Sequence, residues 1–262
     1  MPRPIWKGAI SFGLVTIPVG LYSATESKRP QFRQLRKDDA SRIRYKRVAE
    51  ADEREVPWED IVKGYEVEKG RYVVFTDEEL EAALATRSAG TVDVVQFVEA
   101  QEIDPILYRQ SYYLAPDRSG AKAYRILLEA LAEKGVVGLA RVAIREREYP
   151  ATLRAQDDVI VLETMYWPDE IREPAFEELQ AEVEVRPDEV AMASMIIDNL
   201  TAAFDPTQWV DESREAVEEL ARRKIEGEEI VAPDLPQPTG VVDLMEALKA
   251  SVEATKARRA AG

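Results

Sequence analysis

The sequence contains no cysteine and no histidine among its 262 residues. Without cysteine no disulfide can form, which fits a reducing compartment. The two absences also exclude Ser-His-Asp and Cys-His nucleophile systems. They exclude the usual zinc sites as well, because these use thiolate and imidazole ligands. What remains is chemistry carried by carboxylates or no chemistry at all, and we expect no catalytic residues, resident metal or cofactor.

Long apolar runs and phosphate-binding glycine loops are missing too. The patterns G-x-x-x-x-G-K-[ST] and G-x-G-x-x-G occur nowhere in the chain. No apolar run reaches the roughly 20 residues that span a bilayer. The opening residues MPRPIWKG lack the apolar core of a signal peptide. We therefore expect a cytoplasmic protein with no membrane partner.

The composition is that of an ordinary folded protein, with 45% hydrophobic and 32% charged residues. Its formal net charge is -15, but the charge is segregated along the chain. Residues 1–48 hold 11 Lys and Arg against three acids, a net +8, which leaves -23 for the remainder. Net charge alone would therefore mislead about possible partners.

The positive charge is most concentrated in RQLRKDDASRIRYKR, residues 33–47. Arg42, Arg44 and Lys46 occupy alternate positions, and on a strand they would form a row about 6.7 Å apart on one face. Such a row suits a phosphate backbone, and the scarcity of Asn and Gln favours backbone recognition over base reading. A solvated sheet face and an acidic protein partner remain alternatives. The candidate DNA-binding residues are Arg33, Arg36, Lys37, Arg42, Arg44, Lys46 and Arg47.

The hydrophobic patterns predict mostly strands, with one strong helix among them. Residues 9–23 alternate as a strand whose parity switches after Gly13, which predicts a bulge or sharp bend, with Pro18 at an edge or a break in hydrogen bonding. A strand is expected after the turn at Gly70, followed by a helix that begins with a Thr76–Glu79 capping box. This order is typical of a β-barrel with an excursion. Further strands are predicted over 91–100, 111–117, 136–148, 150–158 and 159–167, with a helix over 121–134 that ends at Gly135.

After Pro187 the pattern becomes helical, with helices predicted over 188–204 and 212–226. The apolar face of the first is expected to fill a core or a dimer contact. A Pro-rich linker follows over 231–240, and then an amphipathic helix. This last helix either packs back on the core or binds a partner groove. Its apolar stripe consists of Val241, Met245, Leu248 and Val252.

Several stretches together resemble the bacterial Ku proteins in order and spacing. They are IWKGAISFGLVTIPVGLYSATE, SRIRYKR, VPWEDIVKGYE, SYYLAPD, WPDEIR, FDPTQWVDESREAVEELARRKIEG and VVDLMEALKASVEA. The resemblance implies a mixed, mainly β fold: a β-barrel core with an inserted bridge, and a C-terminal helical arm that interlocks two copies in a ring-shaped homodimer. It assigns residues 1–187 to the barrel core, with the bridge at roughly 25–90. Residues 188–230 form the arm, and 231–262 the linker and partner-binding helix.

The same resemblance implies a protein without enzymatic activity. The ring would thread onto double-stranded DNA ends, associate with the nucleoid, and recruit and stimulate ligase D in non-homologous end joining of double-strand breaks. Physical size agrees on one point, because a compact chain of this length has a radius of gyration of about 18 Å. One such chain cannot also enclose a duplex, so encirclement requires at least two copies.

The chain departs from the family pattern at several positions. Arg33 and Arg36 stand where family members commonly have histidines, which adds permanent charge. Ala49 and Asp52 stand where many members carry a C-x-x-C pair. Of the long Lys-rich tail of some members only KARRAAG is present here, which puts tail-driven bridging or sliding on DNA in doubt.

Two alternatives from other classes stay open. Plentiful carboxylates could support a magnesium-dependent nuclease, although the acidic clusters have the pattern of solvated helix faces. Alternatively, Tyr45, Tyr112 and Tyr113 could stack on single-stranded nucleic acid, although these tyrosines also suit strand packing.

Overall fold

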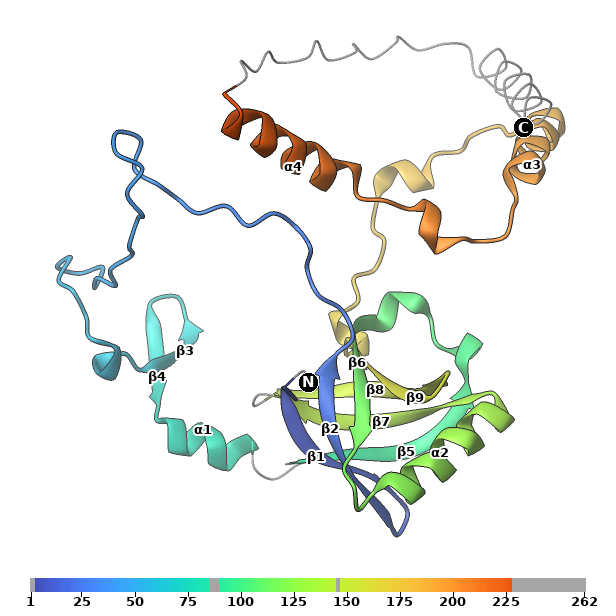
Figure 1. Cartoon of the computed structure of the whole chain (residues 1–262), viewed down its shortest axis with the longest axis horizontal. Helices are drawn as coiled ribbons and strands as arrows, with labels where there is room; N and C mark the ends of the chain where they lie inside the picture. Colours follow the sequence, from blue (N-terminus) through green and yellow to red (C-terminus); the bar gives the residue numbers. More distant parts are fainter. Residues whose placement is uncertain (1–2, 85–89, 145–146, 228–262) are drawn as a thin grey trace. The chain divides into compact units, whose positions relative to one another are not determined.

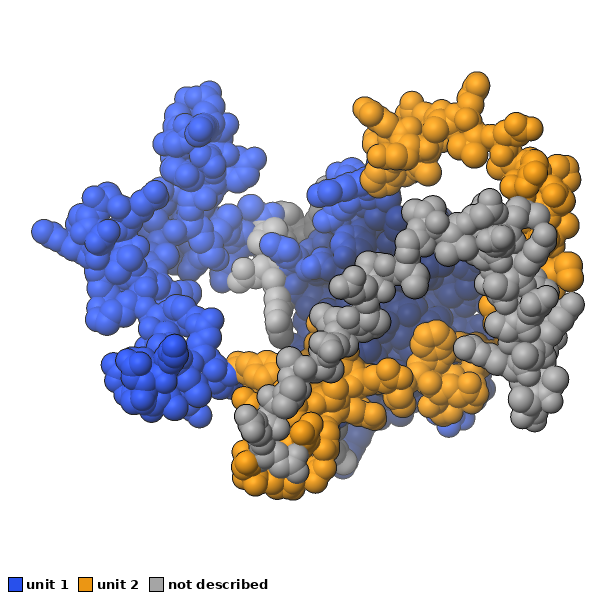
Figure 2. All heavy atoms as spheres, turned by 90° about the horizontal axis from the view of Figure 1, so that it is seen from above, with its two compact units in different colours: residues 1–28, 33–173 blue, residues 29–32, 174–262 orange. Residues whose placement is uncertain are grey.

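The structure is a computed structural model that describes residues 3–84, 90–144 and 147–227. Its contacts divide the chain into two compact units, residues 1–28 with 33–173 and residues 29–32 with 174–262 (Figure 2). The predicted linker over 231–240 and the helix after it lie outside the described residues, and the divisions predicted at residues 187 and 230 stay predictions.

Seven strands close into a barrel in the first unit (Figure 1). Their order around the barrel is β1-β2-β6-β9-β8-β7-β5, and only the closing pair, β1 with β5, is parallel. This architecture confirms the predicted mainly β fold with a β-barrel core. The strands are β1 (Trp6–Phe12), β2 (Val15–Ser23), β5 (Thr91–Glu99), β6 (Tyr108–Pro116), β7 (Val136–Ile144), β8 (Arg147–Gln156) and β9 (Val159–Met165).

The first two strands form a tight hairpin rather than one bent strand. Phe12 pairs with Val15, so only Gly13 and Leu14 lie in the turn. Gly13 has φ 59°, a left-handed value that suits the first position of a two-residue hairpin turn. Of the predicted bulge or sharp bend after Gly13, the bulge is therefore wrong, because the parity switch marks a sharp reversal of the chain. Pro18 lies just beyond the last pair that β2 makes with β6, where its missing N–H costs no bond to that strand.

Alternating apolar side chains fill the interior of the barrel. Ile10, Leu114 and Leu162 come from three different strands and have no exposed surface. Helix α2 (Ala121–Lys134) closes one end, because its inward leucines belong to the same buried cluster. Gly135 ends this helix with φ 65°, as predicted. Burial of each large apolar side chain contributes roughly 1.5–3 kcal/mol.

A long insertion, residues 24–90, leaves the barrel after β2 and returns at β5. It contains the short helix η1 (Trp58–Asp60), the hairpin of β3 (Lys63–Glu68) with β4 (Arg71–Phe75), and helix α1 (Asp77–Leu84). Thr76 Oγ1 accepts from the Glu79 amide at 3.1 Å, and Glu79 accepts from the Thr76 amide at 2.9 Å. This confirms the predicted capping box, and the strand after Gly70 is confirmed as well.

A shorter connection, residues 100–107, links β5 to β6 and carries η2 (Ala100–Glu102) and η3 (Pro105–Leu107). Ile103 from this connection packs with Val137 and Met165 in a second, smaller cluster. These three side chains thus form a separate apolar contact beside the main core.

The second unit carries η5 (Glu177–Gln180), α3 (Pro187–Leu200), η6 (Pro206–Gln208) and α4 (Glu212–Ile225), after the short η4 (Pro168–Glu170) that follows the barrel. Both predicted helices are present, although α3 ends at Leu200 rather than at residue 204. Among residues 174–227 no side chain is buried. Ile197 is 64% exposed and Phe204 is 78% exposed, so the apolar face of this arm is uncovered. No helix in the described residues is both long and apolar enough to cross a membrane.

A single tyrosine connects α2 to the ends of two barrel strands. The Tyr124 hydroxyl donates to the Leu114 carbonyl at 2.5 Å and accepts from the Ile160 amide at 2.7 Å. Burial raises the pKa of Tyr124, which keeps the hydroxyl protonated and able to donate.

We expect Tyr124→Phe to lower the free energy of unfolding by roughly 1–3 kcal/mol, because it leaves a buried donor and a buried acceptor without their partner. Urea denaturation of the purified chain measures this loss. The matched control is Tyr113→Phe, which removes a hydroxyl from a side chain that is 38% exposed and should change stability by less than about 0.5 kcal/mol. Equal stability of the Tyr124→Phe variant and the unchanged chain would contradict the assignment.

Candidate nucleic-acid interface

The basic segment, residues 28–47, lies in the insertion between β2 and β3. It carries nine Lys and Arg against two acids, Asp38 and Asp39. Residues 48–60 reverse this balance, with one Arg against six acids. The insertion therefore contains a sharp boundary between positive and negative charge.

A short hairpin loop organises the middle of the basic segment. The Arg36 amide donates to the Ser41 carbonyl at 2.8 Å, and Leu35 pairs with Arg42 as an isolated bridge. Asp39 sits inside this loop and accepts from the Ser41 amide at 3.0 Å and from Arg36 Nε at 2.9 Å. The Arg36 guanidinium, and then Ser41, hold the pKa of Asp39 well below its usual range. The Arg36 side chain is thus bonded within the loop and stabilises it.

A second short hairpin holds the end of the basic segment against the acidic stretch. Val48 pairs with Glu55, and the Val56 amide donates to the Arg47 carbonyl at 2.9 Å. Lys46 Nζ lies 2.6 Å from Glu55 Oε2, and this carboxylate raises the pKa of Lys46. The Arg47 guanidinium lies 4.6 Å from the centre of the Trp58 ring, a cation–π contact.

The seven candidate cations therefore divide into two groups. Arg36, Lys46 and Arg47 have partners within the insertion. The side chains of the other four are exposed and make no ion pair or hydrogen bond with any described residue. These four, called the open cations below, are Arg33, Lys37, Arg42 and Arg44.

One further arginine shares the state of the open cations. Arg29 is exposed and makes no side-chain ion pair or hydrogen bond with the described residues. The candidate set omitted it, although its position in the positively charged stretch was a signal that could have included it.

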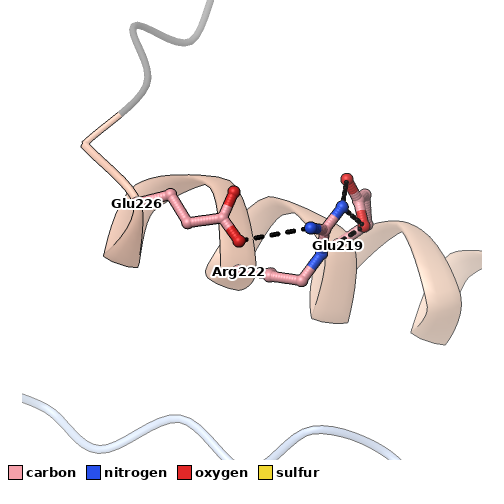
Figure 3. Close-up of polar contacts among 3 residues, drawn as sticks. All are labelled: Glu219, Arg222 and Glu226. Carbon is pink, nitrogen blue, oxygen red and sulfur yellow. Dashed lines mark hydrogen bonds and ion pairs between the residues drawn. The ribbon is translucent and has the colours of Figure 1, made fainter.

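Arg222 on α4 (Glu212–Ile225) differs from the open cations because its guanidinium is paired within its own helix. Its Nη2 donates to Glu219 at 2.7 Å and its Nη1 donates to Glu226 at 3.2 Å (Figure 3). These bonds raise the pKa of Arg222, with Glu219 as the main cause. A guanidinium satisfied within its own helix has fewer donors left for an external phosphate.

The row of cations predicted on a strand over residues 42–47 is wrong. Within that stretch only Arg42 makes a ladder-type contact, the isolated bridge to Leu35. The two short hairpins use the backbone pairing at Arg42 and Val48, so the residues between them connect two turns. No regular pleat therefore imposes the expected spacing of about 6.7 Å.

The three tyrosines considered for stacking are not brought together in one surface. Tyr112 is 8% exposed and packs in the barrel core, whereas Tyr113 is 38% exposed. Neighbouring residues of a strand point to opposite faces, so these two rings lie on different sides of β6. Tyr45 belongs to the insertion, where its hydroxyl donates to Gln34. The described residues also contain no group of three or more acidic side chains placed to hold a metal ion.

The predicted partner-binding stripe, Val241, Met245, Leu248 and Val252, lies outside the described residues. Its role stays a prediction from the sequence.

Comparison with known proteins gives one consistent result. The family model of the Ku70/Ku80 beta-barrel domain matches residues 11–192. Three relatives carry the name non-homologous end joining protein Ku. The Frankia casuarinae protein is 50% identical over 98% of this chain and 65% of its own length. The Heliobacterium modesticaldum protein is 45% identical over 98% of this chain and 94% of its own length. The Bacillus subtilis protein is 41% identical over 96% of this chain and 82% of its own length. The chain thus spans about two thirds of the first relative and nearly all of the second.

Proposed function

The chain belongs to the Ku family, and from this membership we propose that it is a DNA-end-binding protein of non-homologous end joining. It acts without chemistry of its own, as a homodimeric ring that threads onto double-stranded ends. The observation that carries the proposal is the group of open cations in a chain of net charge -15. The side chains of these cations pair with no carboxylate in the part of the chain that the structure describes.

Phosphate is the anion that this arrangement fits best. Three of the open cations are arginines, whose planar forks match phosphate oxygens in two parallel hydrogen bonds. Each neutralised phosphate releases counterions, so binding is independent of sequence and falls steeply with salt. The acidic remainder of the chain repels DNA elsewhere on the surface and favours threading over coating.

A second copy supplies what one chain lacks. One compact chain of this length, with a radius of gyration of about 18 Å, cannot surround a duplex. The arm over residues 174–227 exposes an apolar face, including Leu200 at 65% and Trp209 at 78%. Exposed apolar surface of this extent marks a protein contact, and cyclic dimers are the commonest symmetric assembly. The arm therefore pairs with its counterpart in the second copy.

The predicted terminal helix is the segment through which the ring binds its protein partner. Its stripe of Val241, Met245, Leu248 and Val252 has the spacing of a helix that enters an apolar groove. We assign that groove to ligase D, which the bound ring recruits and stimulates at the break.

DNA topology provides the first test. The chain should bind a linear duplex at least tenfold more tightly than the same duplex closed into a circle, because a ring loads only over an end. Ligating the loaded linear duplex into a circle should then trap the protein against about 1 M salt, which screens phosphate contacts. The measurement is a gel-shift competition with magnesium present.

Each other outcome of that competition points to a different function. Equal affinity for circle and linear duplex contradicts threading, and preference for a single strand indicates the stacking alternative. Cleavage of the duplex that is abolished by a single Asp→Asn change indicates the nuclease alternative.

The open cations provide the second test. Arg42→Gln with Arg44→Gln should weaken linear-duplex binding by at least tenfold at 100 mM salt, because a dimer loses four phosphate contacts. The slope of log affinity against log salt should flatten by about 3 to 4. The control, Arg125→Gln with Arg222→Gln, removes two guanidiniums that already pair with carboxylates. Equal weakening by the control pair would show that only overall charge matters.

Removal of residues 240–262 tests the assignment of the terminal helix. We expect duplex binding within about twofold of the full chain and loss of ligase D stimulation, measured by end joining of a linear duplex. Met245→Asp with Leu248→Asp should reproduce the loss by placing charge on the apolar stripe. Ala247→Asp with Ala250→Asp adds the same charge off the stripe and should retain stimulation. Unchanged stimulation after the deletion would refute the assignment.

A further inference from the structure

The barrel has an open pocket at the end opposite α2. Its volume is about 430 Å³, within the range of small-molecule sites. Mouths of β-barrels are among the preferred places for such sites. The pocket is lined by Ile5, which precedes β1, and by the ends of four strands: Ser23 of β2, Gln110 and Tyr112 of β6, Ile144 of β7, and Arg147 and Tyr149 of β8.

The strand register explains why these residues converge. Residues 110, 112, 147 and 149 continue the inward-facing alternation that buries Leu114 and Leu153 deeper in the barrel. At the α2 end that alternation is covered by the leucines of the helix. At the opposite end it terminates in polar and aromatic side chains around the pocket.

A β-bulge brings a second arginine to this mouth. The pairing of β6 with β9 shifts register between Tyr108 and Gln110, which leaves Arg109 in the bulge. Bulges re-aim side chains, and here the Arg109 guanidinium lies 5.1 Å from the Tyr149 ring and 5.6 Å from the Tyr166 ring. Tyr149 is therefore shared between the pocket wall and this cation–π contact.

Among the described residues that line the pocket, the charged side chain is Arg147, and Arg109 lies against the Tyr149 ring of the pocket wall. The side chains of Arg109 and Arg147 make no ion pair or hydrogen bond with the described residues. No Asp or Glu is among the described residues that line the pocket. Arg147 in the pocket lining and Arg109 on the Tyr149 ring are thus exposed guanidiniums that pair with no carboxylate of the described residues. A ligand that fits must be anionic on one side and flat and aromatic on the other.

We propose that this barrel mouth binds a single nucleotide. The guanidiniums of Arg147 and Arg109 hold the phosphate, since Arg forks match its oxygens. The base lies against the ring of Tyr149, because aromatic side chains stack on every base. The Gln110 amide can donate to and accept from the edge of the base.

The nucleotide has two possible sources with the same chemistry. It is either a free mononucleotide or the unpaired terminal nucleotide of a DNA overhang. The insertion that carries the basic segment leaves the barrel at Ser23 and returns at Thr91, and Ser23 itself lines the pocket. A DNA end held by that insertion is thereby tethered to the mouth side of the barrel. Only the overhang source rests on the proposed function.

Calorimetric titration of the full chain tests the pocket itself. We expect saturable binding of deoxyadenosine 5′-monophosphate, with deoxyadenosine and inorganic phosphate each at least tenfold weaker. Arg147→Gln and Arg109→Gln should each weaken nucleotide binding by at least fivefold, while Arg141→Gln, an exposed arginine of β7 outside the pocket, should leave it unchanged. Arg147 and Arg109 are both exposed, so thermal melting of the variants should match the unchanged chain.

Three results would overturn the proposal. They are no saturable nucleotide binding up to about 10 mM, equal loss in the Arg141→Gln control, and tighter binding of a hexaglutamate peptide than of the nucleotide. The last result would assign the mouth to an acidic peptide.

Duplexes with blunt ends and with a 5′-phosphorylated four-nucleotide overhang then separate the two sources. The unchanged chain is first tested on the blunt duplex, so a failure of the proposed function is seen independently. If Arg147→Gln weakens overhang binding at least fivefold and spares blunt binding, the terminal nucleotide is the ligand. If the nucleotide binds but the overhang is unaffected, the free nucleotide is the ligand. If neither binds at this mouth, the site is refuted.

Discussion

The parallel pairing of β1 with β5 is the constraint on which the rest of the molecule depends. It closes a seven-stranded sheet whose other pairs are antiparallel, and so removes both free edges. Because β2 runs antiparallel to β1, the end of β2 and the start of β5 lie at the same end of the barrel. The insertion over residues 24–90 is therefore anchored at both ends on one rim. The entropy of closing so long a loop grows only slowly with its length.

Within that insertion, ion pairs between neighbouring side chains determine which cations remain available for an external anion. Asp39 forms an ion pair with Arg36, and Glu55 forms one with Lys46. Each ion pair stabilises one of the two short hairpins. The cations left over are those whose side chains pair with no carboxylate of the described residues. The acidic side chains thus stabilise the loops by pairing with some of the cations. The cations that remain unpaired give the surface of the basic segment its positive charge.

Exposed apolar side chains occur on the β3–β4 hairpin and over residues 174–227, and they bear on stability rather than on binding of phosphate. The β3–β4 hairpin is exposed on both faces, with Tyr65 and Val74 each more than half exposed, and the arm has no buried side chain among residues 174–227. Isolated hairpins and helices without a packed face are marginal in water. Contacts within the hairpin and within residues 174–227 therefore contribute little burial to their stability.

The sequence by itself determined the elements with strong local signals. Helix α2 with its glycine cap, the Thr76–Glu79 box, the barrel strands and both arm helices follow from periodicity, turn residues and capping, which act over a few neighbours. Only the tertiary structure decided that residues 42–47 are not a strand, that Arg36 and Lys46 are paired, and that Arg109 lies against Tyr149, which lines the same pocket as Arg147. These outcomes depend on strand register and on partners distant in sequence, and local pattern carries no information about either.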